Sequence, residues 1–350
     1  MYNYIVKDLK LKKKNSLFEK FLIKLNRLFG FEIINNSNYD IISLDKSGSE
    51  NLSSLGEKSI TIPMGSLNIT RKVKGLHIIF RSCASVLLVS QSKKRIFNRE
   101  KSEYSLRSLK SIVNSLNFSK NLFEKLNLQI TIIDHNSNNE VLNKYKKILE
   151  NQYFKSEIIK LNFDKYKNFI NKLNENKKVV TEAMKSNMSN IHQSYELSKN
   201  SDDLIYFVED DYIHKMHTME EMIYSYEKFS TILGKELFLC PTDYPYLYFD
   251  SKDTKIMLGN QSHWRKIDQT LCTFLTSKNM VIKHYDKLLS MCKIEHAPFE
   301  KPLHEIFKTE TCLSPIPSLA VHLTNLNSVF GISPNVNVKK LWEENDYEQY

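Results

Sequence analysis

Three consecutive acidic residues, Glu209, Asp210 and Asp211, follow the apolar stretch LIYFV at residues 204–208. This stretch is short and rich in β-branched and aromatic residues, so it predicts a buried strand. Carboxylates directly after such a strand are costly unless they meet a cation or hydrogen-bond donors. Mg²⁺ or Mn²⁺ bound to a diphosphate would satisfy them, because such ions take one or two carboxylates together with phosphate oxygens. The alternative is an acidic N-cap of the next helix, in which Asp accepts from free backbone N–H groups.

The distribution of glycine excludes several other phosphate sites. The chain has 8 Gly, and none lies between Gly75 and Gly234. A P-loop, a dinucleotide-binding turn and a kinase-type loop all need closely spaced glycines that bring backbone N–H groups against phosphate. The sequence contains none of these motifs.

Composition and charge narrow the class of protein further. The 350 residues are 41% hydrophobic and include 19 Phe and 18 Tyr, which is enough to form a large core and excludes a disordered chain. A net charge of +10 suits polyanionic partners such as a nucleotide diphosphate or a membrane surface, although a general bias toward Lys and Asn would also produce it. Basic runs lie at residues 10–14 and 93–95. No aromatic-interleaved basic motif or Cys/His finger spacing occurs, so we expect no nucleic-acid partner.

Cysteine use and hydropathy bear on the cellular compartment. The five cysteines are widely spaced and include no CxxC pair, which favours reduced thiols over a disulfide framework. The sequence has no run of 18 apolar residues, and its first 15 residues lack the apolar core of a signal peptide. We therefore expect a cytoplasmic protein, with peripheral contact to the cytoplasmic membrane left open.

We interpret residues 1–58 as an N-terminal extension of the main domain, made of an amphipathic helix and a linker. Residues 16–29 place their apolar side chains on one helical stripe and most of their basic side chains off it. This pattern fits either a basic helix on an anionic membrane surface or a helix packed on a protein core, and the packed alternative is favoured because it is commoner. Residues 35–58 are rich in Ser, Asn and Gly and predict a linker.

Strand and helix patterns alternate through residues 59–350, which we expect to form the main domain. Strands are predicted within 59–81 and at 128–134, 157–163, 204–211 and 236–243, and helices at 105–118, 186–200 and 222–233. This alternation predicts an α/β fold with a mostly parallel central sheet and helices on both faces. Ligands bind at the carboxyl ends of the strands in such sheets, where Asp134 and the three acids at 209–211 stand.

An apolar strand that ends in Glu-Asp-Asp resembles the DxD-type motif of GT-A glycosyltransferases, and FVEDD is especially similar to the form in the N-acetylglucosaminyltransferase I family. The helix that begins near Asn187 resembles the one that leads into that strand, and the segment ending in Asp134 resembles the second GT-A strand. The resemblance covers residues 73–330 and divides the domain into a nucleotide-binding half, about 73–211, and an acceptor half, about 212–340. It implies that metal and side chains, rather than a glycine loop, hold the diphosphate.

The resemblance also implies roles for individual residues. The first acid is Glu209 rather than Asp, so Asp211 is the expected ligand of Mn²⁺ or Mg²⁺ and Asp210 is expected to face the ribose. Asp134, Asn187 and Glu209 complete the expected donor site. His322 follows an apolar run near the C-terminus, where several GT-A families place a His on the metal or diphosphate; a structural His is the alternative.

Residues downstream of the acids supply candidates for the acceptor side. Asp243, Tyr244, Trp264 and Arg265 lie in aromatic segments that suit a sugar-stacking wall, although packing between layers and a buried Trp explain them equally well. Inverting GT-A enzymes use a downstream carboxylate as base, and Glu300 is the candidate, with Asp268 and Asp243 behind it. A surface acid at a helix N-terminus is the alternative for Glu300.

These observations predict a metal-dependent glycosyltransferase that moves a hexosyl or N-acetylhexosaminyl group from a nucleotide-diphosphate donor to a hydroxyl of a glycan, lipid or protein, with inversion. A nucleotidyltransferase, or a non-catalytic glycan- or membrane-binding protein with the same fold, is the alternative. His214 and His217 have no third ligand at a suitable spacing, so we do not assign a zinc site to them.

Overall fold

The structure is a computed structural model, and it describes residues 17–31, 53–61, 65–84, 96–249, 254–324 and 331–348. Most of the predicted linker at 35–58 and the basic runs at 10–14 and 93–95 lie outside the described residues. The division into an extension at 1–58 and a domain at 59–350 stays a prediction.

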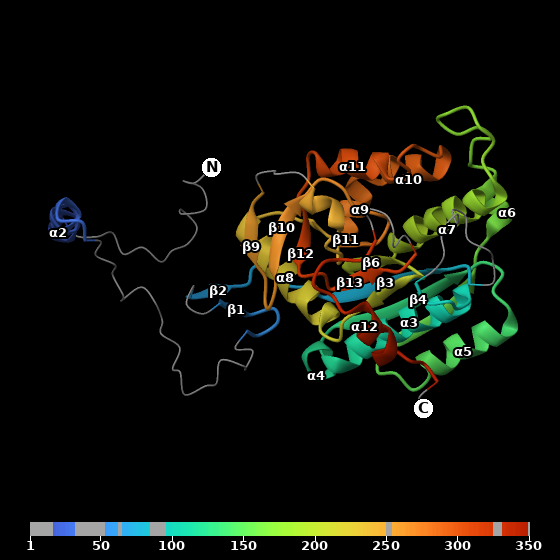
Figure 1. The fold of residues 1–350 in the computed structure, drawn as a ribbon, viewed down its shortest axis with the longest axis horizontal. Coiled ribbons are helices and arrows are strands. Elements are labelled where there is room, and N and C mark those ends of the chain that lie inside the picture. Colours follow the sequence, from blue (N-terminus) through green and yellow to red (C-terminus); the bar gives the residue numbers. More distant parts are fainter. Residues whose placement is uncertain are drawn as a thin grey trace.

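A nine-stranded sheet forms the centre of the molecule (Figure 1). Its strands, in spatial order, are β5 (Lys155–Lys160), β4 (Asn127–Asp134), β3 (Gly75–Ser82), β6 (Leu204–Glu209), β11 (Phe274–Ser277), β8 (Phe238–Leu239), β12 (Cys312–Ile316), β10 (His263–Ile267) and β9 (Ile256–Leu258). Of these nine, β11 and β10 run opposite to the other seven. The predicted α/β fold with a mostly parallel sheet is confirmed.

Helices cover both faces of the sheet. Those the structure describes are α2 (Leu17–Leu28), α3 (Lys101–Phe118), α4 (Lys120–Phe123), α5 (Asn139–Leu149), α6 (Phe163–Lys167), α7 (Glu182–Ser198), α8 (Thr218–Leu233), α9 (Lys278–Lys283), α10 (Tyr285–Lys293), α11 (Lys301–Phe307) and α12 (Val338–Glu344), with a 3-10 turn at Pro245–Tyr248. Apolar side chains of α3, α5 and α8 share one core with β3, β4 and β6. Those of α7, α9, α10 and α11 form a second core on the opposite face.

The cores follow from the sequence pattern. The five apolar residues whose spacing predicted the helix at 105–118 all lie in the first core, as Leu106, Leu109, Ile112, Val113 and Leu116. Alternate residues of β3 divide between the cores, since Ile78 and Phe80 belong to one and Ile79 to the other. Gly75 lets β3 begin close to β4, because a Cβ there would lie 2.6 Å from the carbonyl oxygen of Asn127.

Two short sheets flank the central one. β1 (Lys58–Thr61) and β2 (Gly65–Asn68) pair as antiparallel strands. β7 (Tyr212–His214) pairs antiparallel with β13 (Ala320–His322), so that His322 stands opposite Tyr212. The second pairing brings a residue from near the C-terminus beside the acids that follow β6.

Some predicted boundaries differ from those observed. The strand predicted at 204–211 ends at Glu209, and Asp210 and Asp211 form a turn. The strand predicted at 236–243 is reduced to Phe238–Leu239, since Pro241 has no N–H for a ladder hydrogen bond. All five cysteines are free thiols, in agreement with the sequence. Among the described residues, no helix has the length and apolar character needed to cross a bilayer.

Candidate active site

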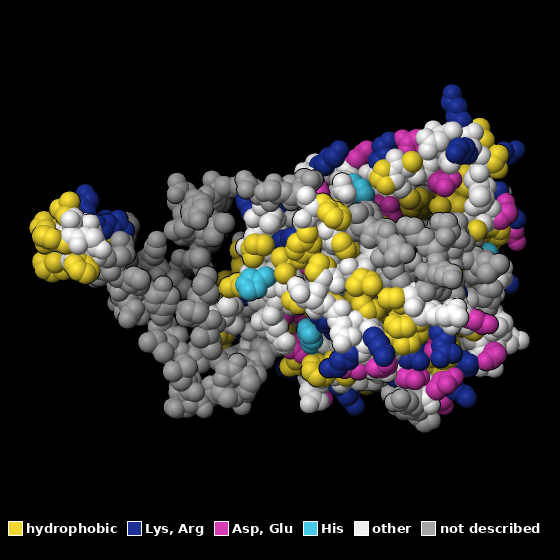
Figure 2. All heavy atoms as spheres, viewed as in Figure 1, with side chains coloured by type: hydrophobic (Ala, Val, Ile, Leu, Met, Phe, Trp, Pro, Cys, Tyr) yellow, Lys and Arg dark blue, Asp and Glu magenta, His cyan; other side chains and the backbone are white. Residues whose placement is uncertain are grey.

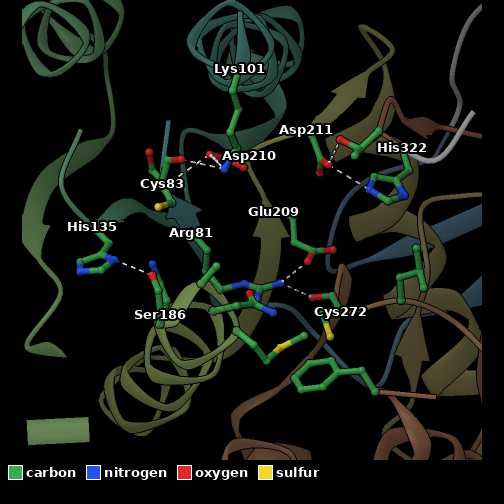
Figure 3. A pocket seen from close by; sticks show the side chains of 18 of the residues that line it. Arg81, Cys83, Lys101, His135, Ser186, Glu209, Asp210, Asp211, Cys272 and His322 are labelled. Atoms are coloured by element: carbon green, nitrogen blue, oxygen red, sulfur yellow. Dashed lines mark hydrogen bonds and ion pairs between the residues drawn. The ribbon is translucent and has the colours of Figure 1, made fainter. Parts of the chain in front are cut away.

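A cavity of about 440 Å³ opens at the carboxyl ends of β3 and β6 (Figure 3). Residues from β3, β6 and β13, from the start of α3, from the N-terminal half of α7 and from the N-cap of α11 surround it. The polar and charged side chains that line it are Arg81, Ser82, Cys83, Lys101, His135, Glu182, Ser186, Asn187, Asn190, Glu209, Asp210, Asp211, Cys272, Glu300, His322 and Thr324. The sequence predicted that a ligand binds at the carboxyl ends of the strands, and the cavity lies at that edge of the sheet.

Asp211 is held by the last residue of β13 and by a residue just after it. Its Oδ2 atom lies 3.0 Å from His322 Nε2 and also accepts from the hydroxyl of Thr324. Its Oδ1 atom is buried and has no hydrogen-bond partner among the described residues. Burial opposes ionisation of this carboxyl, but His322 and Thr324 overcome that effect and hold the pKa of Asp211 at about 2. The site therefore presents one ionised carboxylate oxygen without a hydrogen-bond partner in the described part of the chain.

The His322 ring is fixed by its surroundings. It stacks on Tyr212, with ring centroids 4.7 Å apart and planes inclined by 11°. The hydroxyl of Tyr212 lies 2.7 Å from that of Tyr244, so Tyr244 supports the stack from below the site. These contacts set the position of the imidazole beside Asp211.

Asp210 points to the opposite side of the turn, toward α3. Its Oδ2 atom accepts from the backbone N–H of Cys83 at 3.1 Å and lies 3.3 Å from Lys101 Nζ (Figure 3). Lys101 also donates to the carbonyl oxygen of Cys83 at 2.8 Å. Burial opposes the charge on Lys101, but Asp210 outweighs it and raises the pKa of the ammonium. A charged lysine is thereby fixed at the edge of the cavity.

Glu209 forms an ion pair with Arg81 across neighbouring strands. Arg81 Nη2 lies 3.3 Å from Glu209 Oε1 and 3.2 Å from the carbonyl oxygen of Cys272. The other terminal nitrogen of Arg81 is 3.5 Å from Asn187 Oδ1, which links β3 to α7. Burial raises the pKa of Glu209, and the Arg81 charge opposes that rise.

Glu300 lines the same cavity from the N-cap position of α11. Its side chain makes no capping hydrogen bond, and Oε1 lies 3.9 Å from Cys272 Sγ. Burial raises the pKa of Glu300 to about 7, and the Glu209 charge adds to the rise. Glu300 thus stands at a helix N-terminus, as the surface-acid alternative has it, but it is half-buried and its carboxyl lines the cavity.

The residues present are compatible with a divalent ion held largely by its ligand. Within the described ranges, no group of three His, Cys, Asp or Glu side chains is arranged to hold a metal by itself. Mg²⁺ and Mn²⁺ sites that serve phosphates need only one or two carboxylates, since phosphate and water supply the other oxygens. The Oδ1 atom of Asp211, which has no hydrogen-bond partner among the described residues, is a carboxylate oxygen of this kind.

Two other predicted site residues lie outside this lining. Asp134 ends β4 at the same edge of the sheet, but its carboxylate accepts from the backbone N–H of Ser137 at 3.0 Å and from the Ser137 hydroxyl at 2.5 Å. Asp268 is exposed in the turn after β10. The structure places neither side chain on the cavity.

The predicted acceptor wall needs correction. Trp264 and Tyr244 are fully buried, and Trp264 donates from its indole N–H to Glu221 at 2.9 Å. Asp243 and Arg265 form a buried ion pair next to the Tyr248 ring. None of the four predicted residues lines the cavity. Their aromatic and charged character serves packing, the alternative that the sequence left open.

Sequence reasoning missed two basic residues of the site. Arg81 comes directly after the mostly apolar residues 76–80 near the end of β3, which is the same kind of signal that identified Asp134 and Glu209. Lys101 carried no signal, because a lysine at the start of a helix is ordinarily a solvent-exposed residue. Their positions depend on the parallel pairing of β3 with β6 and on where α3 begins.

Comparison with known proteins gives fold similarity at low identity. No protein-family model matches the chain, and no curated protein matches its sequence. The galactosyltransferase LgtC, solved with donor and acceptor sugar analogues, aligns at a TM-score of 0.35 and 10% identity over 67% of this chain and 66% of its own, just under two thirds. Mouse xyloside xylosyltransferase 1 aligns at a TM-score of 0.36 and 11% identity, over 67% of this chain and 76% of its own. A UDP-glucose pyrophosphorylase aligns at a TM-score of 0.38 and 7% identity, over 74% of this chain and 96% of its own.

Proposed function

We propose that this chain is a metal-dependent glycosyltransferase that moves a sugar from a nucleotide-diphosphate donor to a hydroxyl of a glycan, lipid or protein, with inversion. One observation carries the proposal. A carboxylate with a buried oxygen that has no hydrogen-bond partner among the described residues, Asp211, and a carboxyl that titrates near neutrality, Glu300, line one cavity at the carboxyl edge of the sheet. The two halves of such a transfer need these two groups.

The donor side uses Asp211 together with nearby cations. A divalent ion bound to Asp211 Oδ1 would neutralise the negative charge that develops on the leaving diphosphate. Lys101 and Arg81 add fixed positive charge around the same cavity. Asp210 acts on the donor side indirectly, because its ion pair holds Lys101 in place. Asn187 lines the cavity beside Arg81. The ribose and nucleoside contacts expected of Asp210 and Asp134 stay predictions.

The acceptor side uses Glu300. A sugar or serine hydroxyl has a pKa far above neutrality, so an inverting transfer needs a carboxylate that takes its proton as the new bond forms. A base works best when its pKa lies near the working pH, and that of Glu300 is about 7. Glu300 is a better candidate than Asp268, which lies in an exposed turn away from the cavity.

The test is release of nucleoside diphosphate from a panel of nucleotide sugars, with Mn²⁺, with Mg²⁺ and with a chelator. We expect slow hydrolysis of at least one donor that requires the ion, because water can replace a missing acceptor. A nucleotidyltransferase would instead consume the nucleotide sugar with pyrophosphate and form a nucleoside triphosphate. That result, or no turnover of any donor, would contradict the proposal.

A further inference from the structure

Helix α2 carries an apolar face that the described part of the chain leaves exposed. Leu17 and Leu28 are 86% and 83% exposed, and Phe18 and Phe21 are 69% and 61% exposed. We define the α2 apolar face by these four residues together with Leu25 and Phe29. Exposed apolar groups so concentrated on one short helix mark an interaction surface.

Basic residues flank this face on one side. At about 100° per residue, the six apolar side chains fall within an arc of about 120°, and Lys20, Lys24 and Arg27 lie next to that arc. Figure 2 shows the hydrophobic and basic side chains on different sides of the helix.

We infer that α2 lies in the surface of an anionic lipid bilayer, with its apolar face among the acyl chains and its basic flank at the headgroups. Phe and Leu opposite Lys and Arg are the composition that such interfacial helices use. Each basic residue near the surface gains from the negative potential of anionic lipids. The inference does not depend on the proposed glycosyl transfer.

Charge argues against a second copy of this chain as the occupant. If two α2 helices packed antiparallel through their apolar faces, they would bring two sets of Lys20, Lys24 and Arg27 to the same side, and like charges at close range oppose association. An anionic bilayer instead neutralises these cations. The charge pattern therefore favours lipid over self-association.

Co-sedimentation of the full chain with lipid vesicles tests the inference. We expect binding to vesicles that contain phosphatidylglycerol and much weaker binding to pure phosphatidylcholine. The variant Phe18→Ser/Phe21→Ser/Leu25→Ser should bind the anionic vesicles at least about tenfold more weakly than the wild type. Charge reversal in Lys20→Glu/Lys24→Glu/Arg27→Glu should abolish the preference for the anionic lipid.

Matched variants elsewhere on the surface serve as controls. Phe118→Ser/Val179→Ser/Ile282→Ser removes three apolar residues that are 57%, 73% and 52% exposed. Lys146→Glu/Lys147→Glu/Lys155→Glu changes the net charge as much as the α2 charge reversal does, at three exposed lysines. Both controls should bind vesicles like the wild type, and all variants should keep the wild-type melting temperature.

Three results would overturn the inference. The wild type could fail to sediment with anionic vesicles, or the controls could lose binding as strongly as the α2 variants. Light scattering without lipid could instead show a dimer that the α2 apolar variant converts to a monomer. In that last case a second copy covers the face.

Discussion

Glu300 has the environment of a base rather than that of a helix cap. Its carboxyl faces the cavity, makes no capping hydrogen bond and has a pKa of about 7 because of burial. Glu300→Gln keeps the shape and removes the basicity. We expect turnover to fall by about 10²- to 10⁴-fold with little change in the Kd for the nucleoside diphosphate. Single-turnover transfer assays and calorimetry measure the two quantities, with exposed Asp268→Asn as the matched control.

The same carboxyl predicts a pH dependence. Because only ionised Glu300 accepts a proton, kcat/KM should rise with pH up to about 7 and then level off, and Glu300→Gln should lack this limb. Stability should change in the opposite direction. The folded pKa lies above the ordinary value of 4.5, so the protonated form stabilises the fold at low pH, and this contribution is lost as the pH rises through about 7.

Urea unfolding at several pH values between 5 and 8 checks the stability half of this prediction. The free energy of unfolding of Glu300→Gln, relative to the wild type, should increase as the pH rises. A difference that stays constant over this interval would mean that Glu300 titrates with an ordinary carboxyl pKa. The acid–base role would then have to be reassigned.

The sequence predicted the site acids better than it predicted their partners. Glu209, Asp210 and Asp211 stand out because a buried strand ends where charges begin, and such a pattern is local. Arg81 and Lys101 meet these acids only through the pairing of β3 with β6 and the start of α3. Trp264 was ambiguous for the same reason, since the acceptor of its buried indole N–H, Glu221, lies 43 residues away in the chain.

At the scale of elements, β3, β4, β6, α3 and α7 were predictable because each has a strong local period or a short apolar run. The pairing of β13 with β7 was not predictable, since two three-residue strands far apart in the sequence have too short an apolar pattern to be recognised. That pairing positions His322 and Thr324 at Asp211. The resemblance to GT-A enzymes pointed to His322, but nothing pointed to Thr324.

Helix α12, near the C-terminus, packs against α3. Trp342 stacks on Phe97 with ring centroids 4.3 Å apart, and the guanidinium of Arg107 lies 4.7 Å from the Trp342 ring and donates to its carbonyl oxygen at 2.7 Å. Trp342→Ala should lower the free energy of unfolding by about 3 kcal/mol, because it leaves a cavity and removes aromatic contacts. Lys339→Ala on the same helix is exposed and should change it by less than about 0.5 kcal/mol.

Urea denaturation of the two α12 variants measures these changes. Comparable small effects would show that α12 contributes little to the fold. If Trp342→Ala is the destabilising variant, the contacts of α12 with Phe97 and Arg107 contribute to the stability of the fold.

At the scale of the whole molecule, the sheet gathers charge of both signs at one edge. Carboxylates come from the turn after β6 and from α11, and cations come from β3 and α3. The net charge of +10 was compatible with a nucleotide, a membrane or a general compositional bias. The fold resolves part of that ambiguity, since Arg81 and Lys101 belong to the cavity whereas Lys20, Lys24 and Arg27 belong to the exposed α2 helix.

The central claim is that this cavity binds a nucleoside diphosphate through a divalent ion held by Asp211. Its most direct test is the melting temperature of the wild type, Asp211→Asn and the exposed control Asp164→Asn, with Mn²⁺ and each common nucleoside diphosphate. A ligand that binds only the folded state raises the melting temperature. The account predicts a rise for the wild type and for Asp164→Asn that needs both Mn²⁺ and nucleotide, and none for Asp211→Asn. An equal rise in Asp211→Asn, or no rise in the wild type with any of the nucleotides, would contradict it.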